Sequence, residues 1–307
     1  MIKSITVTNH MGEELTLELA RPEKSGFIVS SIDGLGPVKS TINTTKLARS
    51  HGARYNSSYS DVRSIVINLT YYDDGSVTME SLRHKSYKYF PENEEIKLTI
   101  VTDTRAVYTK CYVEHNEPDI FSNSEGATIT ILCPDPYFYD IGYKSIAFNM
   151  VEPAFEFPFP SDNTEEPSIE FGNIRDVFTR GIKYDGDCNV GVNITLYIYG
   201  NTINPTIYNH MTQDRMCIDT SKLSKLLGTE GVGLIANDII EINTNGMSKS
   251  AKLLRNGEYI NILNCLDKHT QWITLTRGNN SISCYADNNT SSRISLYITY
   301  NTAYGGI

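Results

Sequence analysis

The chain has 307 residues, 40% of them hydrophobic and 21% charged, and its net charge is −9. This composition is typical of globular proteins and excludes a disordered chain, and the length predicts two domains. Acidic residues outnumber Lys and Arg in both halves, 19 to 14 in residues 1–140 and 17 to 13 in residues 141–307, so no basic stripe predicts stable nucleic-acid binding. No apolar run approaches the roughly 18 residues of a membrane span, and we expect no membrane insertion.

Residues 1–140 predict a β-rich N-terminal domain with one helix. Alternation of apolar and polar residues, with Val, Ile, Thr and Tyr abundant, predicts short strands. These strands span residues 2–8, 14–20, 27–32, 64–70, 96–102, 106–114 and 127–133. A helix is predicted over 76–90, with Ser76 as its N-cap. Pro91 ends this helix because the residue before a proline avoids the α region.

A polar run at residues 39–60 separates two of the predicted strands. Loops of about twenty residues are uncommon in compact domains, and this run has too few large apolar side chains to form core. We therefore expect an exposed loop that makes interactions, with disorder as the competing interpretation. Its candidate interface residues are Lys39, Asn43, Lys46, Arg49, Arg54 and Tyr55.

Residues 141–165 are rich in Pro and Phe and predict an ordered linker that packs by its aromatic side chains. Residues 166–307 predict a C-terminal β-sandwich of jelly-roll type, because many short strands follow one another at intervals of about 8–12 residues. Asn256-Gly257 predicts a tight hairpin turn, and a short helix is predicted over 221–227.

No residue pattern in the chain predicts catalysis or metal binding. The six cysteines form no C-x-x-C pair, and we expect them to be reduced thiols. The six histidines lie outside any motif, and no G-x-S-x-G is present. The segment Asp185-Gly-Asp187 lacks the further oxygen donors and the closing Glu of a calcium loop. We therefore expect no enzyme, no catalytic residues, no cofactor and no metal.

Short patches along the whole chain, in the same order, resemble the siphovirus distal tail protein family. In the first half they are Gly34-Leu-Gly-Pro37, Thr41-Ile-Asn-Thr44, Gly52-Ala-Arg-Tyr55, Arg63, the strand 65–69, Leu82-Arg-His-Lys85, Cys111-Tyr-Val-Glu114 and Cys133-Pro-Asp-Pro-Tyr-Phe138. In the second half they are residues 187–191, Gly200-Asn201, Asn204-Pro-Thr-Ile207, residues 238–244, Trp272, Leu275 and Gly278-Asn279.

The resemblance implies a structural protein of the virion tail tip, assembled in the bacterial host cytoplasm. Such a distal tail (baseplate hub) adaptor forms a homohexameric ring from its N-terminal domains, while a galectin-like C-terminal sandwich projects outward. Its partners would be the tail tube protein, a tail-associated lysin or spike hub protein, and receptor-binding or fibre proteins. DNA would pass through the ring without stable binding. The polar run would then contact a neighbouring subunit or the tail tube.

Two alternatives come from other classes of protein. One is a carbohydrate-binding β-sandwich protein acting in host-surface adsorption, with Trp272 as a glycan-stacking platform. The alternation in Trp272-Ile-Thr-Leu275 equally predicts a core strand, so both roles of the indole stay open. The other alternative is a cell-wall hydrolase, for which no motif is present.

Overall fold

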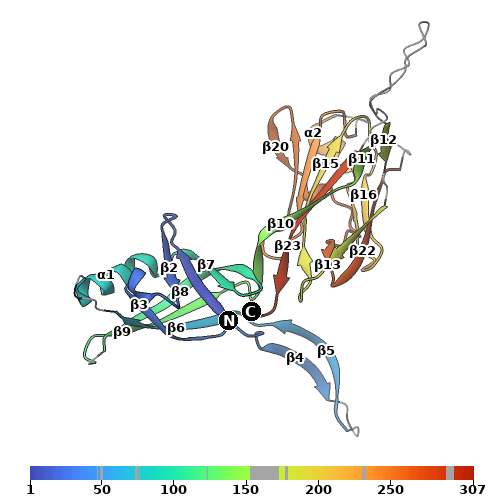
Figure 1. Ribbon diagram of the computed structural model, residues 1–307. Helices are drawn as coiled ribbons and strands as arrows, with labels where there is room; N and C mark the ends of the chain where they lie inside the picture. Colours follow the sequence, from blue (N-terminus) through green and yellow to red (C-terminus); the bar gives the residue numbers. More distant parts are fainter. Residues whose placement is uncertain are drawn as a thin grey trace, which may run out of the picture. The chain divides into compact units, whose positions relative to one another are not determined.

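The computed structural model describes residues 1–46, 48, 51–72, 75, 77–122, 124–152, 173–176, 179–229, 233–287 and 294–307. The chain forms two compact units (Figure 1): the first comprises residues 1–142 and 303–307, and the second comprises residues 143–302. Residues 303–307, which we expected in the C-terminal domain, therefore belong to the first unit.

The first unit is built on one antiparallel sheet. In spatial order its strands are β2 (Glu14–Glu18), β1 (Ile2–Thr8), β7 (Glu95–Thr102), β8 (Ala106–Asp119), β9 (Gly126–Cys133), β6 (Arg63–Tyr71) and β3 (Phe27–Asp33). Strand β10 (Phe138–Ala147) joins β8 where Tyr139 lies opposite Tyr108. Strand β8 carries a bulge between Val113 and His115, the point at which its pairing with β9 shifts register.

The core of the first unit follows from the two-residue period of its strands. In β6, Ile65, Ile67 and Leu69 are buried, whereas Val66 and Asn68 between them are half-buried. The same pattern in β1, β7 and β9 places one apolar face of the sheet inside the unit. The predicted mainly β character is confirmed, with strands at the positions that the alternation indicated.

Helix α1 (Met79–Tyr89) begins three residues later than the sequence predicted. Ser76, the expected cap, lies outside the described residues, and the N-cap is Thr78, whose hydroxyl accepts a hydrogen bond from the Ser81 amide at 3.3 Å. The helix buries Leu82 and Ser86 and ends before Pro91.

Replacing the Thr78 cap by alanine should lower the stability of the first unit by about 1 kcal/mol, because one helical amide loses its acceptor. Hydrogen exchange of the α1 amides measures this loss. Thr78→Ser keeps an accepting hydroxyl and should behave like the unmodified protein. Equal protection in Thr78→Ala and the unmodified protein would show that the cap adds nothing.

The second unit contains two antiparallel sheets. One consists of β13 (Thr179–Tyr184), β22 (Gly278–Tyr285), β16 (Thr206–Asn209) and β17 (Arg215–Cys217). The other consists of β23 (Ile294–Tyr304), whose last two residues belong to the first unit, followed by β15 (Asn193–Ile198), β18 (Ile239–Asn243), β19 (Ser250–Arg255) and β20 (Glu258–Asn261). The rings of Tyr184 in β13 and Tyr300 in β23 pack edge to face between the two sheets, and their centres lie 5.9 Å apart.

Two shorter strand pairs complete the second unit. They are β11 (Asn149–Glu152) with β12 (Asn173–Asp176), and β14 (Val190–Gly191) with β21 (Thr274–Leu275). Residues 141–152 of the expected linker thus lie largely in β10 and β11, and residues 153–165 lie outside the described part of the chain.

The turn and the helix predicted from short sequence patterns in the second unit are both present in the structure. Asn256 and Gly257 both have positive φ (54° and 84°) and connect β19 to β20, which confirms the predicted two-residue turn. Helix α2 (Thr220–Leu227) begins one residue before its predicted start and is capped by Asp219. Single 3-10 turns occur at η1 (Pro22–Lys24) and η2 (Leu263–Cys265).

The described residues contain neither a membrane-spanning helix nor a cluster of metal-binding side chains. No helix there is long and apolar enough to cross a membrane. No group of three or more His, Cys, Asp or Glu side chains is placed to hold a metal ion in the ranges that the structure covers. All six cysteines lie within those ranges and are free thiols.

Candidate functional site

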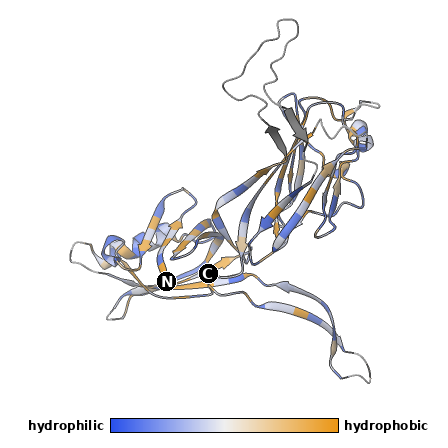
Figure 2. Cartoon of the chain, turned by 45° about the vertical axis from the view of Figure 1, so that its right-hand side comes forward, coloured by the Kyte–Doolittle hydropathy of each residue, from blue (hydrophilic) through white to orange (hydrophobic). Residues whose placement is uncertain are grey.

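Residues 40–46 and 53–60 pair as the two strands of a β-hairpin where the sequence predicted an exposed loop. Strand β4 (Ser40–Lys46) pairs antiparallel with β5 (Ala53–Ser60) and with no other described strand. Figure 1 shows the hairpin extending away from the sheet of the first unit, and in Figure 2 it is mostly white and blue, unlike the orange-banded sheet strands. Neither face of this hairpin packs on a core, so it lacks the apolar alternation by which a strand is recognised in a sequence.

Polar side chains hold the two strands of the hairpin together. The Asn43 amide donates to the Ser57 hydroxyl at 3.1 Å, and the Asn56 amide donates to the Thr45 hydroxyl at 2.6 Å. A bulge between Asn43 and Thr44 shifts the register. Such cross-strand pairs contribute about 0.2–1 kcal/mol each, which leaves a two-stranded hairpin marginal in water.

The hairpin exposes large side chains on both of its faces. Ile42 and Tyr55 lie on one face and are 62% and 60% exposed, and Tyr59 on the opposite face is 57% exposed. An isolated exposed hydrophobic residue is ordinary, but three on a hairpin without a core mark a surface that gains stability when it is covered.

Four of the six predicted interface residues lie on β4 or β5, and they do not form one cluster. Lys39 precedes β4, where its carbonyl accepts from the Asp61 amide. Lys46 and Arg54 lie near the tip on opposite faces, since Lys46 pairs with Ala53 and Arg54 with Thr45. Asn43 is used within the hairpin and Tyr55 is exposed. Arg49 lies outside the described residues.

The buried Arg63 guanidinium holds the base of the hairpin in place. Arg63 follows the hairpin directly, is 1% exposed, and opens strand β6. It donates to the carbonyls of Gly34 and Gly36, at 2.6 and 2.7 Å, just before β4. It also donates to Pro136 and Gly305 at 2.7 and 2.6 Å.

Two further contacts make this base rigid. The Arg63 guanidinium carbon lies 4.3 Å from the centre of the Phe138 ring, a cation–π geometry. Gly34 has φ +87°, and a Cβ there would lie 2.0 Å from the carbonyl oxygen of Ser64. Only glycine fits this position, because both the backbone conformation and the close approach exclude a side chain.

The C-terminal residues of the first unit pack against the same turn. The Ile307 amide donates to the Leu35 carbonyl at 3.1 Å, and the Arg105 guanidinium lies 4.1 Å from the centre of the Tyr304 ring. The carbonyl ligands of Arg63 therefore come from three separate segments, 27 to 242 residues away in sequence. No local pattern could have identified Arg63 as buried, since arginine is almost never fully buried unless paired.

Trp272, the candidate glycan platform, is neither fully buried nor freely exposed. Its indole is half-buried, and the Lys249 ammonium lies 5.3 Å from the ring centre. Its neighbours Ile273 and Leu275 are core residues of the second unit. The lysine therefore occupies part of the ring surface that a stacked sugar would need.

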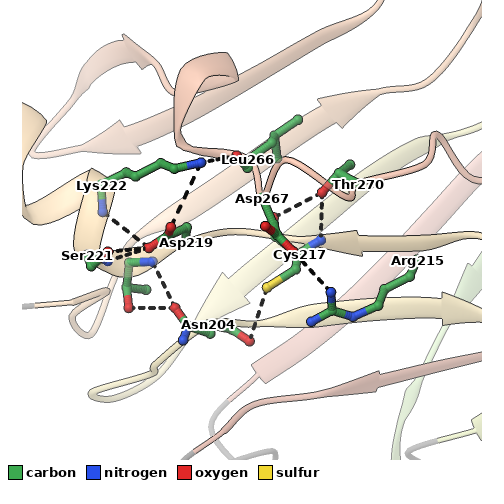
Figure 3. A network of polar contacts seen from close by, with 10 residues as sticks. Asn204, Arg215, Cys217, Asp219, Ser221, Lys222, Leu266, Asp267 and Thr270 are labelled. Atoms are coloured by element: carbon green, nitrogen blue, oxygen red, sulfur yellow. Dashed lines mark hydrogen bonds and ion pairs between the residues drawn. The ribbon is translucent and has the colours of Figure 1, made fainter.

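A polar network at the start of α2 was not foreseen (Figure 3). The Ser221 hydroxyl and the Ser221 and Lys222 amides donate to Asp219, and the Ser221 bond is the main cause that lowers the pKa of this carboxyl. Lys222 donates to the Leu266 carbonyl at 2.8 Å, and Arg215 pairs with Asp267 at 3.1 Å. A hollow of about 710 Å³ lies beside it. These bonds cap the helix and connect it to the loop after η2, so their role is to stabilise the fold.

Comparison with known proteins gives one family and several related structures. Residues 18–133 match the family described as "Phage tail protein RIFT-related domain". The chain is similar in structure to the SPP1 Dit (gp 19.1) protein, called a paradigm of the hub adsorption apparatus in Gram-positive infecting phages, with 12% identity, a TM-score of 0.61, and 97% of this chain and 98% of that chain covered. At this identity the likeness shows a shared fold.

Two lower-scoring structures are chains of the phage P2 baseplate in its activated conformation, one with Ca and one with Sr. Their identities are 11% and 10% and their TM-scores 0.46 and 0.47, with 97% of this chain and 98% and 97% of those chains covered. No curated protein sequence matches the chain.

Proposed function

We propose, from the premise that residues 18–133 are a phage tail protein RIFT-related domain, that the chain is a structural subunit of a phage tail tip. In this proposal the first unit builds a ring of identical subunits, and the β4–β5 hairpin of each copy docks on its neighbour. The observation that carries the proposal is the hairpin itself, a two-stranded arm with exposed apolar side chains and no core of its own.

The charge of the arm favours a second copy of the chain as its partner. Residues 39–60 contain four Lys or Arg and no Asp or Glu. The arm therefore carries +4, and the remainder of a chain with net charge −9 carries −13. Opposite charges steer association and fix the partner, and their effect weakens as salt screens them.

The finer parts of the proposal follow the implied family role. Six copies form the ring, which sits between the tail tube and the tail-associated lysin or spike hub protein and lets DNA pass. The second unit, a galectin-like sandwich in this proposal, holds receptor-binding or fibre proteins. The acidic balance of the chain supports a conduit role, because a strongly basic channel would retain phosphates.

The experiment replaces residues 44–56 by Asn-Gly, which shortens the arm and leaves the paired residues Asn43 and Ser57 on either side of the new turn. We expect the full-length protein to form oligomers in native mass spectrometry and the shortened protein to stay monomeric. Unchanged circular dichroism and hydrogen exchange of β6 would show that both proteins are folded.

Reversing two charges on the hairpin tests whether electrostatic attraction contributes to assembly in addition to the shape of the hairpin. Lys46→Glu with Arg54→Glu should weaken assembly, and higher salt should reduce the difference from the unmodified protein. The matched control, Lys183→Glu with Lys268→Glu, makes the same charge change at exposed sites of the second unit and should assemble normally. Rings that persist after replacement of residues 44–56 would refute the role of the hairpin.

A further inference from the structure

The outward face of the five-stranded sheet in the second unit carries one apolar row. The strand register aligns Tyr197 of β15, Ile239 of β18, Leu254 of β19 and Tyr259 of β20. The two tyrosines at the ends are 36% and 60% exposed, and the aliphatic side chains between them are half-buried. Adjacent strands lie about 4.8 Å apart, so the row is about 14 Å long.

A polar row runs directly beside the apolar one. The register aligns Thr195, Glu241, Lys252 and Asn261 on the same four strands. Tyr259 connects the two rows, because its hydroxyl donates to Glu241 at 3.3 Å and the Lys252 ammonium lies 5.9 Å from its ring centre. One acid and one base leave this row without net charge.

Tyr297 of β23 lies opposite Thr195 in the register, diagonal to Tyr197, and adds an aromatic ring at this edge of the surface. Its ring meets that of Tyr197 edge to face at 5.4 Å and is 41% exposed. Edge-to-face contact restrains both rings, so they offer a fixed aromatic surface rather than mobile side chains. We call this surface, from Tyr297 and Tyr197 across to Tyr259, the tyrosine face.

We propose that the tyrosine face binds a neutral glycan. A sugar chain presents apolar C–H groups on the faces of its rings and hydroxyls around their edges, which match an apolar row bordered by donors and acceptors. The absence of net charge in the polar row gives a polyanion no advantage. A docked protein helix would need an apolar stripe wider than this single row of side chains.

This site differs from Trp272 and does not depend on ring assembly. Trp272 precedes β21, which pairs with β14 and belongs to neither large sheet. Glycan binding by the tyrosine face and oligomer formation are measured by different experiments. One proposal can therefore be refuted while the other is supported.

The test applies the intact protein to an array of printed neutral and anionic glycans, followed by calorimetry with the best neutral oligosaccharide. We expect neutral glycans to bind and anionic ones to bind no better. Tyr259→Ala and Tyr197→Ala should each weaken binding about tenfold, the scale of one lost aromatic contact. Tyr259→Phe keeps the ring and should retain most of the affinity.

The control is Tyr285→Ala, which removes an equally exposed tyrosine (42%) from the other sheet and should bind like the unmodified protein. Matching circular dichroism shows that all variants are folded. The proposal is overturned if no array glycan binds, if Tyr197→Ala and Tyr259→Ala bind normally, or if these variants lose only a protein partner.

Discussion

Arg63→Ala should destabilise the first unit by about 4 kcal/mol, the scale expected when a buried charge-assisted network is lost. The carbonyls of Gly34, Gly36, Pro136 and Gly305 would each lose a charged donor at 2.6 to 2.7 Å. Buried acceptors without a partner retain their full desolvation cost, and no small side chain can replace four divergent bonds.

Hydrogen exchange of the β6 amides is the suitable measurement, because a two-unit chain has no single free energy of unfolding. Arg63→Lys tests whether charge alone suffices. We expect this variant to lose about 3 kcal/mol of stability in the first unit, because one ammonium cannot reproduce the forked geometry of a guanidinium. Arg54→Ala removes an exposed hairpin arginine and should change the opening free energy of the β6 amides by less than about 0.5 kcal/mol. Full protection in Arg63→Ala would contradict the anchoring role.

The second large effect is expected at the buried ion pair of Asp238 and Arg255 in the second unit. Asp238 is 1% exposed and accepts from Arg255 through both carboxylate oxygens, at 2.7 and 2.5 Å. It also accepts from the Ile235 amide at 2.8 Å, which closes the turn before β18. Asp238→Ala should cost about 3–5 kcal/mol, because the Arg255 charge is left poorly solvated without its partner.

A surface pair provides the comparison for Asp238→Ala. Lys183 and Asp185 lie 3.9 Å apart and are 76% and 62% exposed, so Asp185→Ala should change stability by less than about 1 kcal/mol. Hydrogen exchange of β18 and β19 reports both variants. Equal protection in the two variants would show that the Asp238 pair contributes no more than an exposed one.

Both predictions concern residues whose importance depends on tertiary contacts. Arg63 and Asp238 look like ordinary surface charges in the sequence, yet their partners lie up to 242 and 17 residues away, respectively. The tyrosine face depends in the same way on register, because Tyr197 and Tyr259 are brought into one row by pairing across four strands.

The sequence by itself determined the strands that bury one face, such as β6 and β7, because the two-residue period of a pleated strand shows in the order of its residues. It also determined the β19–β20 turn, since Asn256-Gly257 readily adopts positive φ. Only the tertiary structure decided that residues 40–46 and 53–60 are paired strands, that Thr78 caps α1, and that the guanidinium of Arg63 is buried. Each of these features depends on which residues come into contact in the folded chain. The free energy of such contacts is not encoded in any short stretch of sequence.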